Sequence, residues 1–359
     1  MERENKRFLI ALLRFHGDMV LITPLISTIK RLYPHATIDV LVYKGTAKVL
    51  LDDDRINKTY EAHLSSETSF LKKIYKEIRL CLDLKKEKYD YAIFLTTQWR
   101  MALFSRLLSD AKRAGVGDPK RRGAFWKNSF DVIFPEVGDN HILERNLSSL
   151  TSLGFELIQE DYQLDLIVLD STRISIENKI SHINFNNSNQ HLDLSQPYCV
   201  FHPFSRRETK LWNVEGFANL ADYYSKTGLN VIFTSGPEKE EIDYLEKIEN
   251  NCNEPVLNLG GKTQLLELAA LIEDAEFFLG LDSVSSHISA AMNTPSVTLF
   301  GPSVSRNWKP WSERSIIIER IGKEEKCPKH YPLGGKFERC LCYIHATKVI
   351  ESVDKALKL

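Results

Sequence analysis

The sequence predicts an α/β fold with two doubly wound domains that face a central cleft. Short buried apolar runs alternate with stretches of helical periodicity in both halves of the chain, which is typical of parallel sheets wrapped by helices. At 359 residues the chain is too long for one ordinary core. Residues 183–197, rich in Asn, Ser and Gln, are typical of an interdomain linker between the two alternating sets.

The first domain is expected to span residues 1–185. It opens with an apolar run, a short loop, an amphipathic segment and a second apolar run, which is the order of a strand, helix and parallel strand. Its predicted strands are residues 8–13, 37–43 and 91–95, and its predicted helices are residues 19–32, 70–84, 100–108 and 142–153.

The second domain is expected to span residues 195–345. Its predicted strands are residues 198–202, 230–234, 256–259, 276–281 and 296–300. Its predicted helices are residues 214–226, 238–250, 265–273 and 285–292. The segment 346–359 follows a sheet that is already complete, and we expect its helix to pack back across the domain junction.

Composition and charge limit the setting in which the protein works. The longest apolar runs, residues 8–13 and 19–26, fall short of the roughly 18 residues that span a bilayer. Residues 1–7 lack the apolar core of a secretory signal, so a cytoplasmic location is expected. Residues 1–150 carry 26 Lys and Arg against 19 Asp and Glu, whereas the remainder has a net charge of −8. This asymmetry indicates an anionic partner or membrane surface, or else scatter on solvated helix faces.

Six cysteines in a chain of this size do not indicate a disulfide framework. Cys81, Cys199 and Cys252 stand singly and are expected to be buried thiols. A second group near the C-terminus can bind zinc or consist of reduced structural thiols, because its spacing matches no standard pair of Cys-x-x-Cys knuckles. This group is Cys327, His330, Cys340 and Cys342. We assign no metal site and no cofactor.

Residues 280–303 carry the strongest functional signal. They predict a buried strand, a polar loop and a helix of small residues, so helix N-terminal amides can hold a phosphate just past the strand. A carboxylate beside a phosphate is repelled unless it has another task, such as accepting hydrogen bonds from sugar hydroxyls. The pattern therefore favours a nucleotide sugar. The donor-binding residues assigned here are Asp282, Ser283, Val284, Ser285, Ser286 and His287; the last can instead be an ordinary structural histidine.

Two further loops follow predicted strands of the second domain. The loop at residues 203–212 gathers a hydroxyl and several cations, which suit phosphate oxygens, although it can also be an exposed basic loop. We assign Ser205 and Arg206 to the donor and Lys210 to the leaving diphosphate. Glu238 ends a segment that either contacts a base or ribose or simply starts a helix.

The loop after the first strand has one glycine, which argues against the G-x-G-x-x-G pattern of a dinucleotide site. It places Asp18 at the carboxyl end of a strand. This residue can cap the helix that starts at Met19, or it can act as a general base that takes a proton from an attacking hydroxyl. The densest basic stretch of this domain can contact phosphates or carboxylates of an acceptor; it contains Arg113, Lys120, Arg121 and Arg122.

Four segments together resemble glycosyltransferase family 9, the heptosyltransferases of lipopolysaccharide core assembly. They are RFHGDMVLITPLISTIKRLYP, HPFSRRETKLW, LGGKTQLLELAALI and GLDSVSSHISAAMNTPSVTLFGPS. The resemblance covers nearly the whole chain in the right order. Within the family, residues 16–19 and 308–311 are most similar to the heptosyltransferase III subgroup.

The resemblance implies a GT-B architecture, with two Rossmann-like domains that bind the acceptor on the first and the nucleotide sugar on the second. It also implies an inverting, metal-independent transfer from ADP-heptose to an inner-core heptose on lipid A. The enzyme would contact the cytoplasmic face of the inner membrane peripherally and would bind no nucleic acid.

By this resemblance Asp18 becomes the general base, and His16 and Gly17 of the same loop are assigned to the acceptor. Lys210 matches the family's lysine near the diphosphate, and Asp282 matches the aspartate that contacts the heptose. Because Asp18 and Lys210 lie in different predicted domains, we expect the cleft to close during the reaction. The alternatives are a nucleotide-sugar 2-epimerase of the same architecture, a family 9 transferase with another donor or acceptor, and a non-catalytic sugar-nucleotide-binding module.

Overall fold

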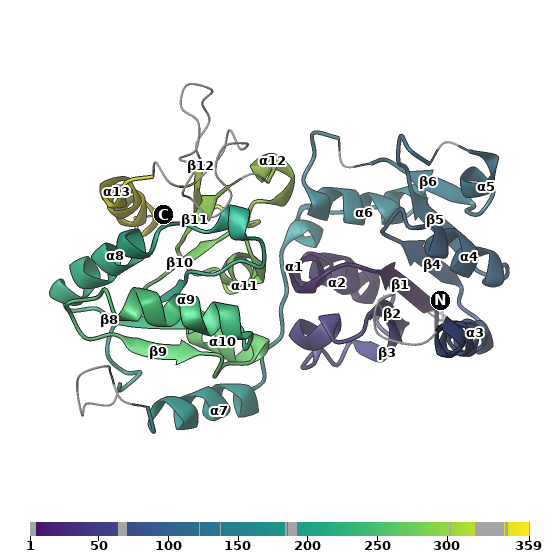
Figure 1. Cartoon of the computed structure of the whole chain (residues 1–359). Coiled ribbons are helices and arrows are strands. Elements are labelled where there is room, and N and C mark those ends of the chain that lie inside the picture. Colours follow the sequence, from purple (N-terminus) through teal and green to yellow (C-terminus); the bar gives the residue numbers. More distant parts are fainter. Residues whose placement is uncertain are drawn as a thin grey trace. The chain divides into compact units, whose positions relative to one another are not determined.

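The computed structural model of the chain divides into two units, Met1–Ile167 and Val168–Leu359, each built on a six-stranded parallel sheet (Figure 1). The residues that it describes are 5–63, 70–121, 123–136, 138–183, 185, 192–301, 303–319, 341 and 344–358. The strand orders are β3-β2-β1-β4-β5-β6 and β12-β11-β10-β7-β8-β9. Both are the 3-2-1-4-5-6 order of a Rossmann-like fold, so the predicted α/β fold class is confirmed.

The first unit contains strands β1 to β6. They are β1 Arg7–Leu12, β2 Thr37–Tyr43, β3 Ile56–Ala62, β4 Tyr91–Phe94, β5 Lys112–Val116 and β6 Val132–Phe134. Its helices are α1 His16–Val20, α2 Thr23–Leu32, α3 Phe70–Lys86, α4 Trp99–Leu107, α5 Ala124–Lys127 and α6 Ile142–Ser152, with short 3-10 turns η1 Thr46–Leu50 and η2 Gln159–Tyr162.

The second unit contains strands β7 to β12. They are β7 Tyr198–His202, β8 Asn230–Ser235, β9 Leu257–Gly260, β10 Phe277–Leu281, β11 Ser296–Phe300 and β12 Ser315–Glu319. Its helices are α7 Asp170–Ile180, α8 Val214–Lys226, α9 Lys239–Glu249, α10 Leu265–Glu273, α11 Val284–Ala291, α12 Ser305–Trp308 and α13 Ala346–Ala356, with the 3-10 turn η3 Glu208–Lys210.

Strand β1 is buried on both faces, as expected for a central parallel strand. Leu9 and Ala11 face a core that includes Leu84 of α3 and Phe104 of α4. Phe8 faces the other side of the sheet, where its ring stacks on that of Tyr91 at 4.8 Å between centroids. This double burial explains why the apolar run around β1 is continuous in the sequence. Among the described residues, no helix is long and apolar enough to cross a membrane.

The C-terminal helix belongs to the core of the second unit. Val349 and Val353 of α13 are fully buried in the core of the second unit, together with Phe217 of α8 and Leu299 of β11. The helix packs on α8, β11 and β12, because its apolar stripe needs an apolar surface to cover. We therefore assign α13 to the second unit, and packing across the junction stays a prediction.

The boundary between the units also differs from its prediction, which placed it within residues 183–197. Helix α7 already belongs to the second unit and packs on α10. The carboxylate of Glu267 accepts hydrogen bonds from Lys179 Nζ at 2.6 Å and from Ser175 Oγ at 2.7 Å. Polar contacts thus attach α7 to α10. The spacing of apolar residues in the sequence does not reveal contacts of this kind.

The predicted helix at residues 19–32 is two helices in the structure. Pro24 lies in the first turn of α2, where a missing amide hydrogen costs nothing, whereas inside a continuous helix it would remove a hydrogen bond. The strands missed from the sequence are β3, β5, β6 and β12. Only two of the seven residues of β3 are buried, so it lacks the apolar run that marks a central strand.

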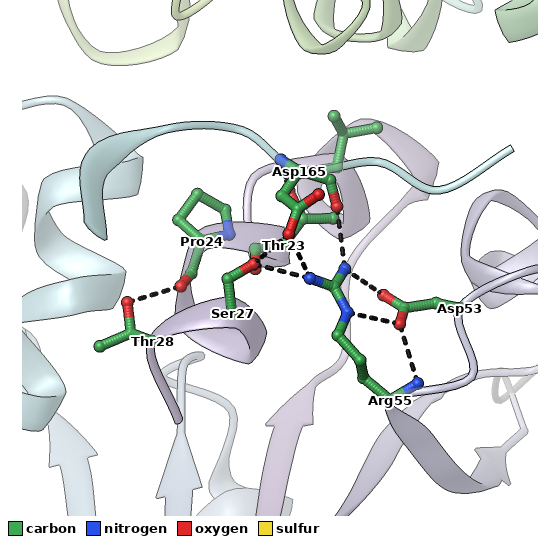
Figure 2. Close-up of polar contacts among 8 residues, drawn as sticks. Thr23, Pro24, Ser27, Thr28, Asp53, Arg55 and Asp165 are labelled. Atoms are coloured by element: carbon green, nitrogen blue, oxygen red, sulfur yellow. Dashed lines mark hydrogen bonds and ion pairs between the residues drawn. The ribbon is translucent and has the colours of Figure 1, made fainter. Parts of the chain in front are cut away.

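A polar network fixes the end of the first unit to its body (Figure 2). The Arg55 guanidinium binds both carboxylate oxygens of Asp53 at 2.7 Å, and it also pairs with the Asp165 carboxylate and donates to the Asp165 carbonyl at 2.9 Å. Ser27 Oγ donates to Asp165 Oδ2 at 2.7 Å, and the Asp165 amide donates to Thr23 Oγ1 at 3.1 Å. Arg55, which lies just before β3, therefore joins that strand to Asp165 near the end of the first unit.

Replacing Arg55 tests the network. The Asp53 side chain is only 2% exposed, so Arg55→Met leaves a buried carboxylate without its cation. We expect the free energy of unfolding to fall by about 2–4 kcal/mol, measured by urea denaturation. Lys239→Met removes the exposed Lys239–Asp243 pair of α9 and is expected to leave the unfolding curve unchanged. Equal curves for the wild type and Arg55→Met would show that the network does not stabilise the unit.

Candidate active site

Asp18 lies just beyond the carboxyl end of β1, as predicted, but it is not a helix N-cap. Helix α1 begins at His16 with Phe15 as its N-cap, which makes Asp18 the third helical residue. Its side chain is 16% exposed. The Phe15 amide donates to Asp18 Oδ2 at 3.4 Å, and Arg14 Nε lies 3.6 Å from Oδ1. The carboxylate thus stabilises the start of α1 from within the first turn.

Burial decides how Asp18 ionises. It raises the pKa of this carboxyl above its ordinary value, although Arg14, the Phe15 amide and Arg145 each oppose the rise. Arg145 belongs to α6 and donates from Nη2 to the Leu95 carbonyl at 3.0 Å; burial lowers its pKa to about 10. A raised carboxyl pKa brings Asp18 closer to the working range of a general base.

Arg145 was not predicted as a site residue. Its Nε is buried and has no hydrogen-bond partner among the described residues, which is an uncommon state for a guanidinium. The only sequence signal was a charged residue inside a helix whose buried residues include Leu143, Leu147 and Leu150. It contributes positive potential to Asp18 from α6, a helix distant in the sequence.

His16 is held in one tautomer. Its Nδ1 lies 3.0 Å from the Thr46 carbonyl oxygen in η1, and a carbonyl can only accept, so Nδ1 carries the hydrogen. The neutral ring then has Nε2 as its acceptor. His16 and Gly17 lie in the first turn of α1 beside Asp18. The three residues that the sequence assigned to one loop are therefore close together.

The four cations predicted to bind the acceptor do not form one cluster among the described residues. Arg121, in the loop after β5, donates from Nε to the Thr97 carbonyl at 2.9 Å and stacks 4.6 Å from the Trp99 ring. Lys120 is exposed in the same loop, and Arg122 lies outside the described residues.

Arg113 differs from its prediction. It pairs with Asp131 at 2.7 Å near the amino end of β5, level with Ala92 of β4 and Leu9 of β1. It is therefore remote from the carboxyl edge that carries Asp18. The ion pair raises the pKa of Arg113 and lowers that of Asp131. We interpret this arginine as a structural residue.

In the second unit, Asp282 joins two predicted residues into one cluster. It follows β10, while Ser205 and Lys210 come from the loop after β7, the neighbouring strand. Lys210 Nζ forms an ion pair with the Asp282 carboxylate, and Ser205 Oγ donates to the Asp282 carbonyl at 3.0 Å. The two ionised side chains are only 15% and 9% exposed, so their charges are poorly screened by water.

Helix α11 begins immediately after this cluster. Ser283 is its N-cap, but the Ser283 hydroxyl bonds to Ser285 Oγ at 2.6 Å instead of capping a backbone amide. Ser286 Oγ donates to the Ser283 carbonyl at 2.8 Å. The first amides of any α-helix lack intrahelical acceptors, so Val284 and its neighbours present donors that suit a phosphate. His287 is buried in the next turn.

Comparison with known proteins now decides the family. The profile of Glycosyltransferase family 9 (heptosyltransferase) matches residues 78–333. Lipopolysaccharide heptosyltransferase 3 of Escherichia coli is 35% identical over 346 residues, which cover 96% of this chain and 97% of that protein. The chain belongs to glycosyltransferase family 9. It is a glycosyltransferase, and its predicted similarity to the heptosyltransferase III subgroup is confirmed.

Solved structures share the fold of this family 9 transferase. The glycosyl transferase family 9 protein of Veillonella parvula aligns with a TM-score of 0.78 at 19% identity, over 100% of this chain and 99% of that one. Escherichia coli heptosyltransferase WaaC with ADP aligns at 0.72 and 17% identity, over 98% and 99%. Membership of a transferase family argues against the 2-epimerase and the non-catalytic binding module that the sequence left open.

The family 9 transferase also buries a histidine that sequence reasoning missed. His202, the last residue of β7, has its Nδ1 3.0 Å from Thr234 Oγ1 on β8. Burial lowers the pKa of His202 to about 4, so the ring is neutral at physiological pH. It lies next to Gly280 of β10 in the strand register. Its neighbour Pro203 opens the loop that carries Ser205 and Lys210.

Other predicted donor residues are more exposed. Arg206 is exposed in the loop after β7, and Glu238 is the exposed N-cap of α9. The turn before Glu238 is closed by Glu241, which accepts the Gly236 amide at 2.6 Å; burial raises the pKa of Glu241. The turn therefore has a structural explanation of its own.

The cysteines are only partly as predicted. Cys199 is buried, but Cys81 and Cys252 are half-buried, and all three are free thiols. Within the part of the chain that the structure describes, no group of three or more His, Cys, Asp or Glu is arranged to hold a metal ion. The candidate zinc group near the C-terminus, with Cys327, Cys340 and Cys342, lies outside the described residues.

His202 gives the transferase a pH dependence of stability. Between about pH 6.5 and 4 the unfolded histidine binds a proton that the folded one excludes. Stability is therefore fully present above about pH 6.5 and falls by up to about 3 kcal/mol as the pH drops towards 4. His202→Gln removes the titrating group, so its urea midpoint should depend less on pH in this window. A wild type and variant with parallel pH profiles would contradict the neutral buried histidine.

Proposed function

We propose that this protein transfers a heptose from ADP-heptose to an inner-core heptose of lipopolysaccharide, with inversion at the anomeric carbon and with Asp18 as the general base. The observation that carries the proposal is the largely buried carboxyl of Asp18, 16% exposed, just beyond the end of β1 in a chain that belongs to the heptosyltransferase family. The relative that is 35% identical is named lipopolysaccharide heptosyltransferase 3, and a solved neighbour is WaaC with ADP.

The chemistry assigns one task to the first unit. An acceptor hydroxyl attacks the anomeric carbon of the donor, the bond from that carbon to the phosphate oxygen breaks, and Asp18 takes the hydroxyl proton. A carboxylate suits this task when burial brings its pKa closer to neutral, which is the direction found for Asp18. Arg14 and Arg145 oppose the rise and so favour the ionised form, which is the form that accepts the proton.

The second unit supplies the complementary task, which is to hold the leaving ADP. Lys210 offers a cation of low exposure, and the amides at the start of α11 offer hydrogen bonds to phosphate. When a diphosphate binds, Lys210 is placed to shift from Asp282 towards it, and the Asp282 carboxylate is then available to accept hydrogen bonds from the sugar. Ser205 holds the Asp282 main chain in place meanwhile.

The acceptor and the location complete the proposal. A heptose on lipid A is anchored in a bilayer, so the transferase works from the cytoplasm in peripheral contact with the inner membrane. Arg121 and Lys120 follow β5, on the carboxyl edge of the sheet that carries Asp18, and they suit phosphates or carboxylates of the acceptor.

Replacing the base tests the mechanism. Asp18→Asn keeps the shape of the side chain but cannot accept the proton, so we expect kcat to fall by about 10²–10⁴ while donor affinity stays unchanged. Because the base acts when ionised, the wild-type rate should rise with pH through the raised pKa of Asp18, and this limb should vanish in the variant. Asp110→Asn, an exposed change, is the control. A variant that keeps the wild-type rate and pH profile would refute the role.

Titration calorimetry tests the donor. We expect ADP-heptose to bind more tightly than UDP- or GDP-sugars, and Lys210→Met to weaken its binding about 10- to 100-fold, because a charge-assisted contact to the diphosphate is lost. Lys210→Met/Asp282→Asn separates that loss from repulsion by an unpaired carboxylate. Lys226→Met, on exposed α8 surface, is the matched control. Preference for a uridine donor would overturn the ADP-heptose assignment.

A further inference from the structure

Two neighbouring helices of the first unit are apolar on their outer faces as well as on their inner faces. On α3, Leu80 and Leu84 are buried in the core, yet Ile78 and Leu82 are 54% and 55% exposed. Tyr75 is exposed on the same helix, so exposed apolar residues recur at spacings of three and four along one face. A solvated helix normally places polar residues there.

Helix α4 repeats the arrangement. Trp99, Leu103 and Leu107 are spaced by four residues and are all exposed, whereas Met101 and Phe104 between them are buried. The Arg100 guanidinium of α4 bonds both carboxylate oxygens of Glu77 on α3, at 2.9 and 2.7 Å. The ion pair holds the two helices side by side, and Figure 1 shows α3, α4 and α5 along one flank of this unit.

Helix α5 extends the apolar surface and adds cations to it. The exposed Phe125 ring lies 5.4 Å from the Trp99 ring, centroid to centroid. Arg106 stacks 4.4 Å over Phe125, and Arg121 stacks over Trp99. Large apolar side chains interleaved with guanidinium groups are typical of surfaces that enter the boundary between water and lipid.

The net charge is concentrated on these same helices. Helices α3, α4 and α5 contain nine Lys and Arg against two acidic residues, a net charge of +7. The whole first unit, residues 1–167, has 26 Lys and Arg against 23 Asp and Glu, a net charge of only +3. The rest of the unit is therefore acidic, and the positive charge belongs to the apolar flank.

We propose that this flank, which we call the α3–α5 face, docks on an anionic lipid bilayer with its apolar side chains in the headgroup region. The face is defined by Tyr75, Ile78, Leu82, Trp99, Leu103, Leu107 and Phe125 with the described cations Lys76, Arg79, Lys85, Lys86, Arg100, Arg106 and Lys127. The choice of a bilayer rests on the proposed function, in which the acceptor is a membrane lipid. Docking concentrates the enzyme on the surface where its acceptor lies.

Charge and shape favour a bilayer over a second copy of the chain. Two such faces repel each other because their cations outnumber their carboxylates, whereas an anionic membrane attracts each one. The face is built from convex helix surfaces on separate helices, and insertion into lipid needs no matched groove.

Vesicle co-sedimentation tests the proposal on the full chain. The wild type should bind vesicles of phosphatidylcholine mixed with phosphatidylglycerol, bind pure phosphatidylcholine weakly, and lose binding as salt rises. Ile78→Ser/Leu103→Ser and, separately, Lys85→Gln/Lys127→Gln should each weaken binding at least about fivefold. The matched control is Ile174→Ser/Leu357→Ser, because Ile174 on α7 has the same 54% exposure as Ile78 and Leu357 follows α13.

Activity assays separate failure of docking from failure of the proposed function. Turnover of a water-soluble, deacylated acceptor should be equal in the wild type and Ile78→Ser/Leu103→Ser, whereas turnover of acceptor embedded in vesicles should fall in the variant. Docking is overturned if the wild type ignores anionic vesicles or if variant and control bind equally. It is also overturned if sedimentation velocity without lipid shows a dimer that the variant abolishes, which would assign the face to a second copy.

Discussion

The pairing of β7 with β10 is the constraint on which the proposed donor site depends. The register sets Gly280 beside His202, so Asp282 emerges two residues later against the loop that follows β7. A Cβ at Gly280 would lie 2.5 Å from the Phe278 ring and 3.4 Å from the His202 carbonyl, so a side chain there would have to displace the buried Phe278 ring. Ser205 and Lys210 can hold Asp282 only because this register brings the two strand ends together.

The two carboxylates of the proposed mechanism differ in how their charge is balanced. Asp282 has a lysine in direct contact at low exposure. Asp18 has its nearest cation, Arg14, at 3.6 Å and on a side chain that is 42% exposed. Burial therefore dominates at Asp18, which favours proton acceptance, whereas Asp282 has the Lys210 ammonium in direct contact. The same residue type thus serves two purposes because its surroundings differ.

Sequence reasoning predicted the elements that are buried on both sides. The strands at residues 37–43, 198–202 and 296–300 agree with β2, β7 and β11 at both ends, because a central parallel strand must be an unbroken apolar run. It failed where partners distant in sequence decide the outcome. The pairing of Arg113 with Asp131, the contribution of Arg145 to Asp18 and the attachment of α7 to α10 leave no periodic signal.

The sequence shows that residues 1–150 carry an excess of positive charge, but only the structure shows which surface carries it. The excess of Lys and Arg in residues 1–150 indicated an anionic partner or membrane surface, or scatter on solvated faces, and the basic stretch that includes Arg113 was assigned to the acceptor. In the structure Arg113 is neutralised by Asp131, and the excess lies on α3, α4 and α5, beside apolar side chains that face solvent. Charge that is combined with exposed apolar area suits a lipid surface better than a soluble anion, since a soluble anion offers nothing to cover that area.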